Sequence, residues 1–176
     1  MTGLPGLRGG DHLGITVPDI EAASAFLVDV LGAEAFYDLG PVAAADDGLA
    51  ARLGVDPSAV LRKVRFLRLG HGLNLELFEY AVAGQHRTPP RNSDIGGHHI
   101  ALYVDDMQAA VAHLRAHGVE VMGEPMRRDA GPGGGQSWVY FRCPWGLQME
   151  LVSYPAGKGY ERTTDRRLWD PRVPAR

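Results

Sequence analysis

Apolar and polar residues follow the same succession of patterns twice along this chain. Apolar residues alternate with others over residues 11–17, and a helical pattern of apolar positions then runs from 19 to 31. The second copy shows the alternation over 98–104 and the helical pattern over 106–117. Short alternating segments complete each copy. They predict strands at 34–39, 61–69 and 73–81 in the first copy, and at 119–122, 137–143 and 147–154 in the second.

The order strand, helix and three strands therefore occurs twice, which predicts an α+β protein made of two tandem βαβββ modules. A segment rich in proline, glycine and polar residues separates the copies, and a charged segment with two prolines follows the second one. The first copy is the longer because it carries extra residues between Pro41 and Leu61. The predicted divisions are 11–81 for the first module, 82–97 for the linker, 98–154 for the second module and 155–176 for a C-terminal arm.

Two histidines and two glutamates occupy equivalent places in the two copies. His12 begins the first strand of one copy and His99 the first strand of the other, with His98 as the nearest competitor. Glu76 and Glu150 lie in the last strands, each between two apolar neighbours. Because side chains alternate between the faces of a strand, all four point away from the apolar face that packs on the helices. If the sheets curve around a shared concavity, the four side chains meet inside it.

This set of side chains is typical of a site for one divalent metal ion. Two neutral imidazoles and two carboxylates balance the charge of the ion, and such nitrogen and oxygen ligands suit Ni, Co, Zn, Mn or Fe. The metal would polarise a substrate carbonyl while a carboxylate, Glu150 or Glu76, acts as the general base. Return of the proton to a neighbouring carbon gives isomerisation, and return to the opposite face gives epimerisation.

Composition narrows the class of protein. The chain has 176 residues, of which 45% are hydrophobic and 22% charged, so it is long enough to bury a core. A net charge of -3 does not favour a nucleic-acid partner, and no apolar run is long enough to span a membrane. Cys143 is the single cysteine, which excludes an internal disulfide, and the N-terminus lacks the apolar core of a signal peptide. We expect a cytoplasmic protein.

Aromatic residues share the strand faces that carry the candidate ligands. They suit the binding of a small-molecule substrate with apolar or ring-shaped parts. Ordinary filling of a barrel interior explains them equally well. The candidate substrate-binding residues are Phe78, Tyr80, Tyr103, Tyr154 and Trp138, with Tyr140 as a further pocket wall beside Trp138.

Four segments of the chain form recognisable motifs: His12 to Asp19 with its Val17-Pro18-Asp19 end, Asn74-Leu75-Glu76-Leu77, His99 to Asp106, and Pro144-Trp145-Gly146 followed by Glu150 and Leu151. These segments are similar to motifs of the vicinal oxygen chelate superfamily, which contains glyoxalase I, methylmalonyl-CoA epimerase, extradiol dioxygenases and bleomycin-resistance proteins. The resemblance covers residues 11–154, and Cys143 stands where aspartate is common in the family.

The resemblance implies paired βαβββ modules that form a curved, barrel-like mixed sheet with the helices outside. It also implies a metal at His12, Glu76, His99 and Glu150, a set that resembles glyoxalase I and related isomerases. We therefore expect a metal-dependent lyase, isomerase or epimerase that acts through an enediolate-type intermediate on a small oxygen-rich substrate. The alternatives are an Fe(II) dioxygenase of the same fold and a non-catalytic, resistance-type binding protein. A homodimer is expected, with the metal centre within one chain or shared between two.

Overall fold

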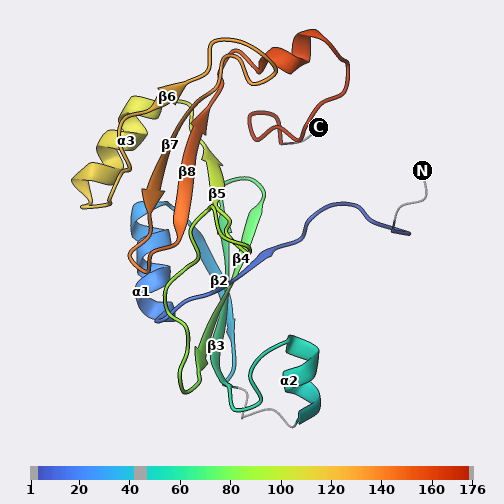
Figure 1. The fold of residues 1–176 in the computed structure, drawn as a ribbon, viewed down its shortest axis with the longest axis vertical. Helices are drawn as coiled ribbons and strands as arrows, with labels where there is room; N and C mark the ends of the chain where they lie inside the picture. The colour runs from blue at the N-terminus through green and yellow to red at the C-terminus, as the bar shows by residue number, and fades with distance from the viewer. Residues whose placement is uncertain (1–3, 42–46, 175–176) are drawn as a thin grey trace. The chain divides into compact units, whose positions relative to one another are not determined.

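The computed structural model describes residues 4–41 and 47–174, which fall into two compact units that meet in sequence between Gln85 and His86. The first unit contains a four-stranded mixed sheet with a helix against one face (Figure 1). Its elements are β1 (Leu13–Thr16), α1 (Ile20–Ala25), the π-helical turn η1 (Phe26–Val30), β2 (Glu34–Leu39), α2 (Asp47–Leu53), β3 (Val60–Leu69) and β4 (Leu73–Ala81).

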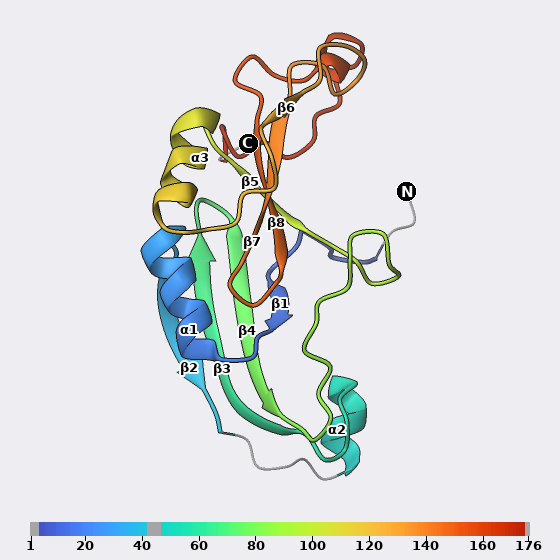
Figure 2. The same ribbon diagram turned by 60° about the vertical axis from the view of Figure 1, so that its left-hand side comes forward.

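The strands of the first sheet follow the order β1-β4-β3-β2, with β1 parallel to β4 and the other neighbours antiparallel. Helix α1 lies across one face of this sheet (Figure 2). Leu75 and Leu77 of β4 are fully buried, and so are Ile20 and Leu27 of the helical segment. Because side chains alternate along a strand, burial of these two leucines turns Glu76 of β4 to the opposite face of the sheet.

Side-chain acceptors fix the beginning of helix α1 and of the equivalent helix in the second unit. Asp19 precedes α1 and accepts a hydrogen bond from the backbone N–H of Ala22 at 2.9 Å. Asp106 has the same role before the helix of the second unit, where it accepts from Ala109 at 3.0 Å. Such caps satisfy N–H groups that have no partner within the helix. The two aspartates therefore set where each strand passes into its helix.

The second unit repeats the architecture of the first, with a four-stranded sheet in the order β5-β8-β7-β6. Strand β5 runs parallel to β8, and the other neighbours are antiparallel. Val111 and Leu114 of the helix and Phe141 and Met149 of the sheet form the buried core. The elements are β5 (Ile100–Tyr103), α3 (Met107–Ala116), β6 (Met126–Arg127), β7 (Ser137–Arg142), β8 (Gln148–Ser153) and the 3-10 turn η2 (Gly159–Arg162).

The two sheets agree in register as well as in strand order. Gly14 pairs with Glu76 in the parallel ladder of the first sheet, and Ala101 pairs with Glu150 in that of the second. The N–H that follows each first strand donates to the last strand, at 2.8 Å in the first sheet and 2.9 Å in the second. The predicted α+β architecture of two βαβββ modules is confirmed, and each first strand is placed beside its glutamate strand.

The predicted strand at 119–122 is interrupted in the structure. Met122 donates its N–H to the Tyr140 carbonyl at 2.8 Å, so the chain does pair with β7 there. Gly123 then adopts a φ of 89°, a left-handed conformation that ends the extended run. Pairing resumes at β6, which was not predicted. The apolar pattern located this pairing, but the predicted strand is reduced to the isolated bridge of Val121 with Phe141, and β6 is a separate two-residue strand beyond Gly123.

The residues that follow β8 pack on the end of that strand. Arg172 donates to the Tyr154 carbonyl at 2.8 Å and is paired with Asp170 at 2.6 Å. The ammonium of Lys158 and the guanidinium of Arg172 lie over the Tyr154 ring, 4.2 and 4.8 Å from its centroid. These contacts tie the C-terminal arm to the second sheet. Over the described part of the chain, no helix has the length and apolar character needed to cross a membrane.

Candidate metal centre

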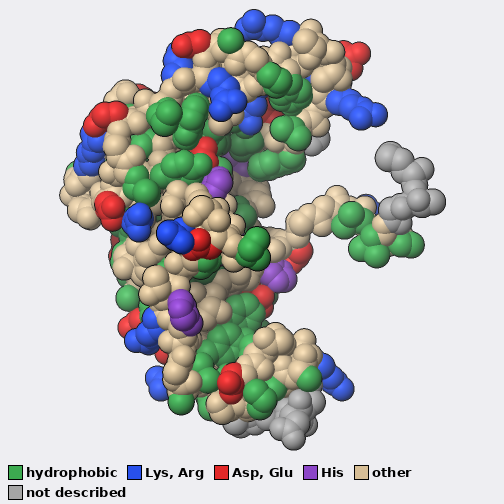
Figure 3. All heavy atoms as spheres, in the orientation of Figure 1, with side chains coloured by type: hydrophobic (Ala, Val, Ile, Leu, Met, Phe, Trp, Pro, Cys, Tyr) green, Lys and Arg blue, Asp and Glu red, His purple; other side chains and the backbone are tan. Residues whose placement is uncertain are grey.

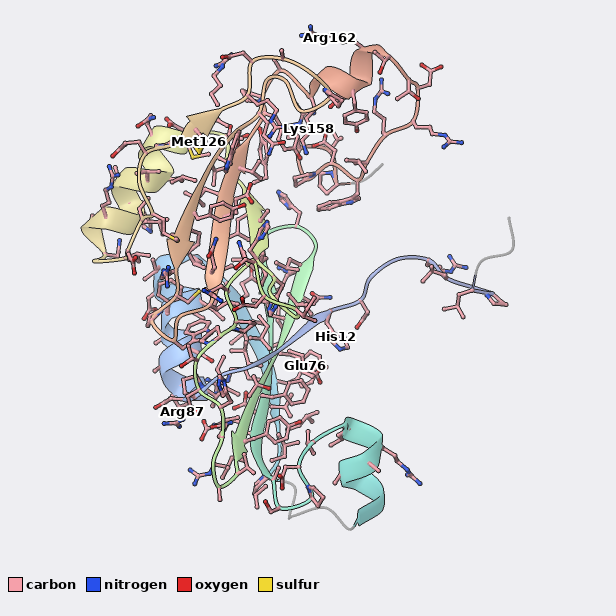
Figure 4. The ribbon with its side chains drawn as sticks, viewed as in Figure 1. His12, Glu76, Arg87, Met126, Lys158 and Arg162 are labelled. Atoms are coloured by element: carbon pink, nitrogen blue, oxygen red, sulfur yellow. The ribbon has the colours of Figure 1, made fainter. Side chains whose placement is uncertain are left out.

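The first histidine–glutamate pair forms within the first unit. His12 lies directly before β1, and Glu76 lies on the neighbouring strand β4, one residue along from the pairing of Leu13 with Leu75. This register brings His12 Nε2 to 3.0 Å from Glu76 Oε2 (Figure 4). The His12 side chain is 38% exposed and that of Glu76 only 18%, so the carboxylate is the more enclosed of the two groups.

The second pair forms in the same way within the second unit. His99 lies directly before β5, and Glu150 lies on the parallel strand β8. His99 Nε2 is 3.0 Å from Glu150 Oε2, the same two atoms at the same distance as in the first unit. His98, the competing candidate, instead directs its Nδ1 to the Gly96 carbonyl at 3.0 Å. The structure therefore pairs His99 rather than His98 with the glutamate.

The spacing within each pair is that of two neighbouring ligands on one metal ion. Imidazole nitrogen and carboxylate oxygen bind divalent metals at about 2.1 Å, so two such ligands at a right angle lie about 3.0 Å apart. The spacing is 3.0 Å in both pairs. Within either unit, the described residues offer no group of three or more His, Cys, Asp or Glu side chains able to hold a metal. Each unit contributes two of the four predicted ligands, and their joint action at one ion remains a prediction.

A carboxylate lies behind His12. Asp11 Oδ2 is 2.8 Å from His12 Nδ1, on the side of the ring opposite Glu76. The hydrogen bond with Asp11 raises the pKa of His12, and the charge of Glu76 raises it further against the effect of desolvation. When Nδ1–H donates to Asp11, the neutral ring keeps its Nε2 lone pair for a metal. The Nδ1 of His99 instead lies 3.4 Å from the Asn92 amide nitrogen, a donor that cannot accept Nδ1–H as the Asp11 carboxylate does.

An aromatic ring stands beside each histidine at equivalent positions. Phe66 meets His12 edge-on with ring centroids 5.9 Å apart, and Tyr140 meets His99 edge-on at 5.2 Å. Burial, followed by the charge of Glu150 and a hydrogen bond with it, raises the pKa of the Tyr140 phenol. Sequence reasoning missed Phe66 and treated Tyr140 only as a pocket wall. Both rings stand ten positions before their glutamate (76 − 66 and 150 − 140), a repeat signal that was available in the sequence.

Two of the predicted substrate-binding residues lie on the face of Glu76. Phe78 and Tyr80 of β4 are half-buried and stack on each other, with centroids 5.8 Å apart and planes at 11°. Tyr37 of β2 stacks on Phe66 at 4.6 Å, and 54% of the Tyr37 side chain is exposed. Hydrophobic side chains gather over this face of the first sheet (Figure 3). The arrangement offers flat apolar surfaces close to the His12–Glu76 pair.

The other three predicted substrate-binding residues belong to the second sheet. Tyr103 and Tyr154 meet edge-to-face with centroids 4.9 Å apart. Tyr154 is buried beneath Lys158 and Arg172 of the arm, so its ring has a packing role. Trp138 is half-buried on β7, with the Arg128 guanidinium 5.6 Å from its ring centroid. Of the three, Tyr103 and Trp138 keep a partly open surface.

Comparison with known proteins shows which family this chain belongs to. The chain belongs to the glyoxalase/bleomycin resistance protein/dioxygenase superfamily, whose model matches residues 11–138. A 2-epi-5-epi-valiolone epimerase from Actinomyces sp. is 48% identical over 170 residues, which cover 96% of this chain and 92% of the relative. The uncharacterized protein YaeR of Escherichia coli K12 is 30% identical and covers 83% of this chain and 96% of its own length. The named epimerase confirms the expectation of an enzyme of the isomerase type.

Solved structures show the same fold. A glyoxalase family protein from Enterococcus faecalis matches with a TM-score of 0.59 at 23% identity, over 82% of this chain and 97% of the other. The fosfomycin resistance protein FosX of Listeria monocytogenes, complexed with Mn(II) and sulfate, matches with a TM-score of 0.54 at 22% identity. That match covers 90% of this chain and 99% of FosX. At these identities the likeness supports the fold and leaves the reaction to the site itself.

Proposed function

We propose that this protein is a metal-dependent epimerase that inverts one stereocentre next to the carbonyl of a polyhydroxylated cyclic ketone. The observation that carries the proposal is the pair of repeat-equivalent His–Glu contacts, each 3.0 Å between Nε2 and Oε2. The relative that is 48% identical is named for the epimerisation of 2-epi-5-epi-valiolone, so this compound or a close relative of it is the proposed substrate.

The proposed centre consists of His12, Glu76, His99 and Glu150 around one divalent ion. Two neutral imidazoles and two carboxylates make this set electrically neutral with a 2+ ion, which limits the cost of holding it in a partly buried place. The fold relative FosX was crystallised with Mn(II), which supports an ion of this kind, and Ni, Co, Zn and Fe suit the same ligands. The four ligands meet within one chain or between the two chains of a homodimer.

The reaction requires removal of a proton from a carbon and its return to the other face. A bound metal supplies Lewis-acid polarisation of the substrate oxygens, which makes the neighbouring C–H more acidic. One of the two carboxylates, Glu76 or Glu150, is proposed to accept that proton, since each lies beside the histidine of its own sheet. Phe78 and Tyr80 offer the flat surface on which the apolar face of the ring rests.

Metal analysis combined with an exchange assay tests the proposal. The wild-type protein should hold about one divalent ion per four-ligand centre and should exchange the substrate proton next to the carbonyl with deuterium from D₂O, as followed by NMR. His12→Ala and Glu150→Ala should lose the ion and the exchange. His71→Ala is the matched control, because His71 is exposed and lies in the turn between β3 and β4.

The outcomes separate the candidate functions. A protein that takes up no metal after reconstitution, yet binds the ketone tightly without turnover, would instead be a binding protein. Turnover that depends strictly on O₂ and Fe(II) would point to the dioxygenase. If the protein takes up the metal but does not exchange the substrate proton with solvent, the metal centre is supported and the epimerase activity is refuted.

A further inference from the structure

The two His–Glu pairs differ in the residue that faces the carboxylate across the antiparallel ladder. Phe66 of β3 is the partner of Glu76, and Tyr140 of β7 is the partner of Glu150. Both rings meet their histidine edge-on, with interplanar angles of 78° and 83°. The two half-sites therefore have the same aromatic packing, and the phenolic hydroxyl is the chemical difference between the two rings.

The two carboxylates also differ in burial, and Glu150, which faces the tyrosine, is the more buried of the two. The Glu150 side chain is 9% exposed and that of Glu76 is 18% exposed. The parallel partner of Glu150 is Ala101, whereas that of Glu76 is Gly14. A Cβ at Gly14 would lie 3.3 Å from Phe78 Cε2 and 4.0 Å from Glu76 Oε2, so the Phe78 ring packs closely on this glycine. The exposed fractions of the two side chains therefore indicate that Glu76 is the less enclosed carboxylate.

We propose that Tyr140 is a positioning residue that holds the Glu150 carboxylate through its hydroxyl, and that the two carboxylates consequently have different tasks. Glu150 stays in place as the fixed ligand. Glu76, which has Phe66 beside it and the more exposed carboxylate, leaves its resting position to take the proton from one face of the substrate carbon, and solvent water supplies a proton to the other face. This inference rests on the proposed metal-dependent epimerase and assigns separate roles to its two glutamates.

The physical basis is the number of hydrogen bonds that restrain each carboxylate. A carboxylate ligand that also accepts a hydrogen bond from a phenol keeps one orientation, and loss of such a supporting contact costs about 10- to 100-fold in metal affinity or activity. The Glu150 carboxylate lies 3.0 Å from His99 Nε2, and Tyr140 faces Glu150 across the β7–β8 ladder. The phenylalanine at the equivalent place beside Glu76 offers no such donor. A base must be able to rotate from its metal toward the substrate, which favours the carboxylate without the extra bond.

Exchange of the two ring types tests this assignment. Tyr140→Phe removes the hydroxyl and keeps the ring, and Phe66→Tyr adds a hydroxyl in the equivalent place. Tyr160→Phe is the matched control, because its hydroxyl accepts a hydrogen bond from Leu168 in the C-terminal arm. Co(II) affinity is measured by competition with a chelator, together with the visible Co(II) spectrum. The values of kcat and KM for 2-epi-5-epi-valiolone are measured at saturating Co(II).

Tyr140→Phe should weaken Co(II) binding about 10-fold and change the Co(II) spectrum, while Tyr160→Phe should match the wild type in both. Phe66→Tyr should retain Co(II) and lose about 10-fold in kcat with little change in KM, because the new hydroxyl restrains Glu76. Wild-type Co(II) affinity and spectrum in Tyr140→Phe would overturn the inference. So would an unchanged kcat in Phe66→Tyr, which decides the matter alone if Tyr140→Phe fails to fold.

The control on the proposed function is the wild-type protein itself. Wild-type protein that binds no Co(II) or does not epimerise the ketone refutes the metal-dependent epimerase, and the inference falls with it. Wild-type protein that does both, beside a Tyr140→Phe variant with unchanged Co(II) binding, refutes the positioning role alone. Thermal unfolding of the metal-free proteins shows whether each variant keeps the wild-type fold.

Discussion

Asp11 Oδ2 lies 2.8 Å from Nδ1 of His12, on the opposite side of the imidazole from Glu76. The carboxylate orients the ring and favours the tautomer whose Nε2 lone pair is free for a metal. The group beside Nδ1 of His99 is the amide nitrogen of Asn92 at 3.4 Å, which is a hydrogen-bond donor and not an acceptor. The two histidines therefore depend on their supporting residues to different degrees.

Asp11→Asn should accordingly weaken metal binding by about 10-fold, since an amide orients the ring less strongly than a carboxylate. Isothermal titration of the metal-free protein with Co(II) measures the change. Asn92→Ala is the matched comparison and should have the smaller effect, because its contact with His99 is long. Equal losses in the two variants would show that the Asp11 carboxylate has no special role.

Glu79 connects the first sheet to its helix. Its Oε2 accepts a hydrogen bond from the N–H of Ile20, the first residue of α1, at 2.9 Å. The carboxylate also lies at the positive end of the helix dipole. Glu79→Ala should lower the free energy of unfolding by about 1 kcal/mol, as measured by urea denaturation. Glu34→Ala, at an exposed site, should stay within about 0.5 kcal/mol of the wild type, and an equal loss in both would contradict the capping role.

Arg65 makes the first unit sensitive to acid. Hydrogen bonds from this arginine are the main cause of the lowered pKa values of Glu21 and Asp38. A carboxylate whose pKa is lowered by folding contributes stability that is present above its unfolded value, here 4.5 and 3.8, and is lost as the pH falls through the folded value.

Arg65→Met should therefore flatten the dependence of stability on pH between about pH 5 and pH 3, relative to the wild type. Urea unfolding across this range gives the measurement. Arg68→Met removes a more exposed arginine from the same strand and should keep the wild-type slope. A wild-type slope in Arg65→Met would mean that other groups control the acid sensitivity.

The thiol of Cys143 should be unreactive in the folded protein. Its side chain is buried, and desolvation raises the pKa of the thiol to about 12, so thiolate is scarce at neutral pH. We expect no reaction with a chromogenic disulfide reagent at about pH 8 until denaturant is added, after which one thiol per chain should react. Fast labelling of the native protein would show that the β7–β8 turn opens readily.

Local patterns in the sequence were enough to determine the repeat, the helices and most strands. The alternation of Leu75, Glu76 and Leu77 assigned the faces of β4 because strand periodicity is a local property. The aspartates at 19 and 106 marked the helix starts for the same reason. Strand β6, which follows Gly123, was not predicted, because a left-handed glycine depends on how the chain turns in three dimensions.

The repeat in the sequence also selected His12, Glu76, His99 and Glu150, since polar residues at equivalent places in the two copies stand out without coordinates. Only the tertiary structure decided that these residues approach as two pairs at 3.0 Å, and that His99 rather than His98 is the partner of Glu150. Those distances follow from strand register, which joins residues far apart in the chain. The roles of Phe66 and Tyr140 depended on the same register, because a ring becomes part of a site only when the ladder sets it beside a ligand.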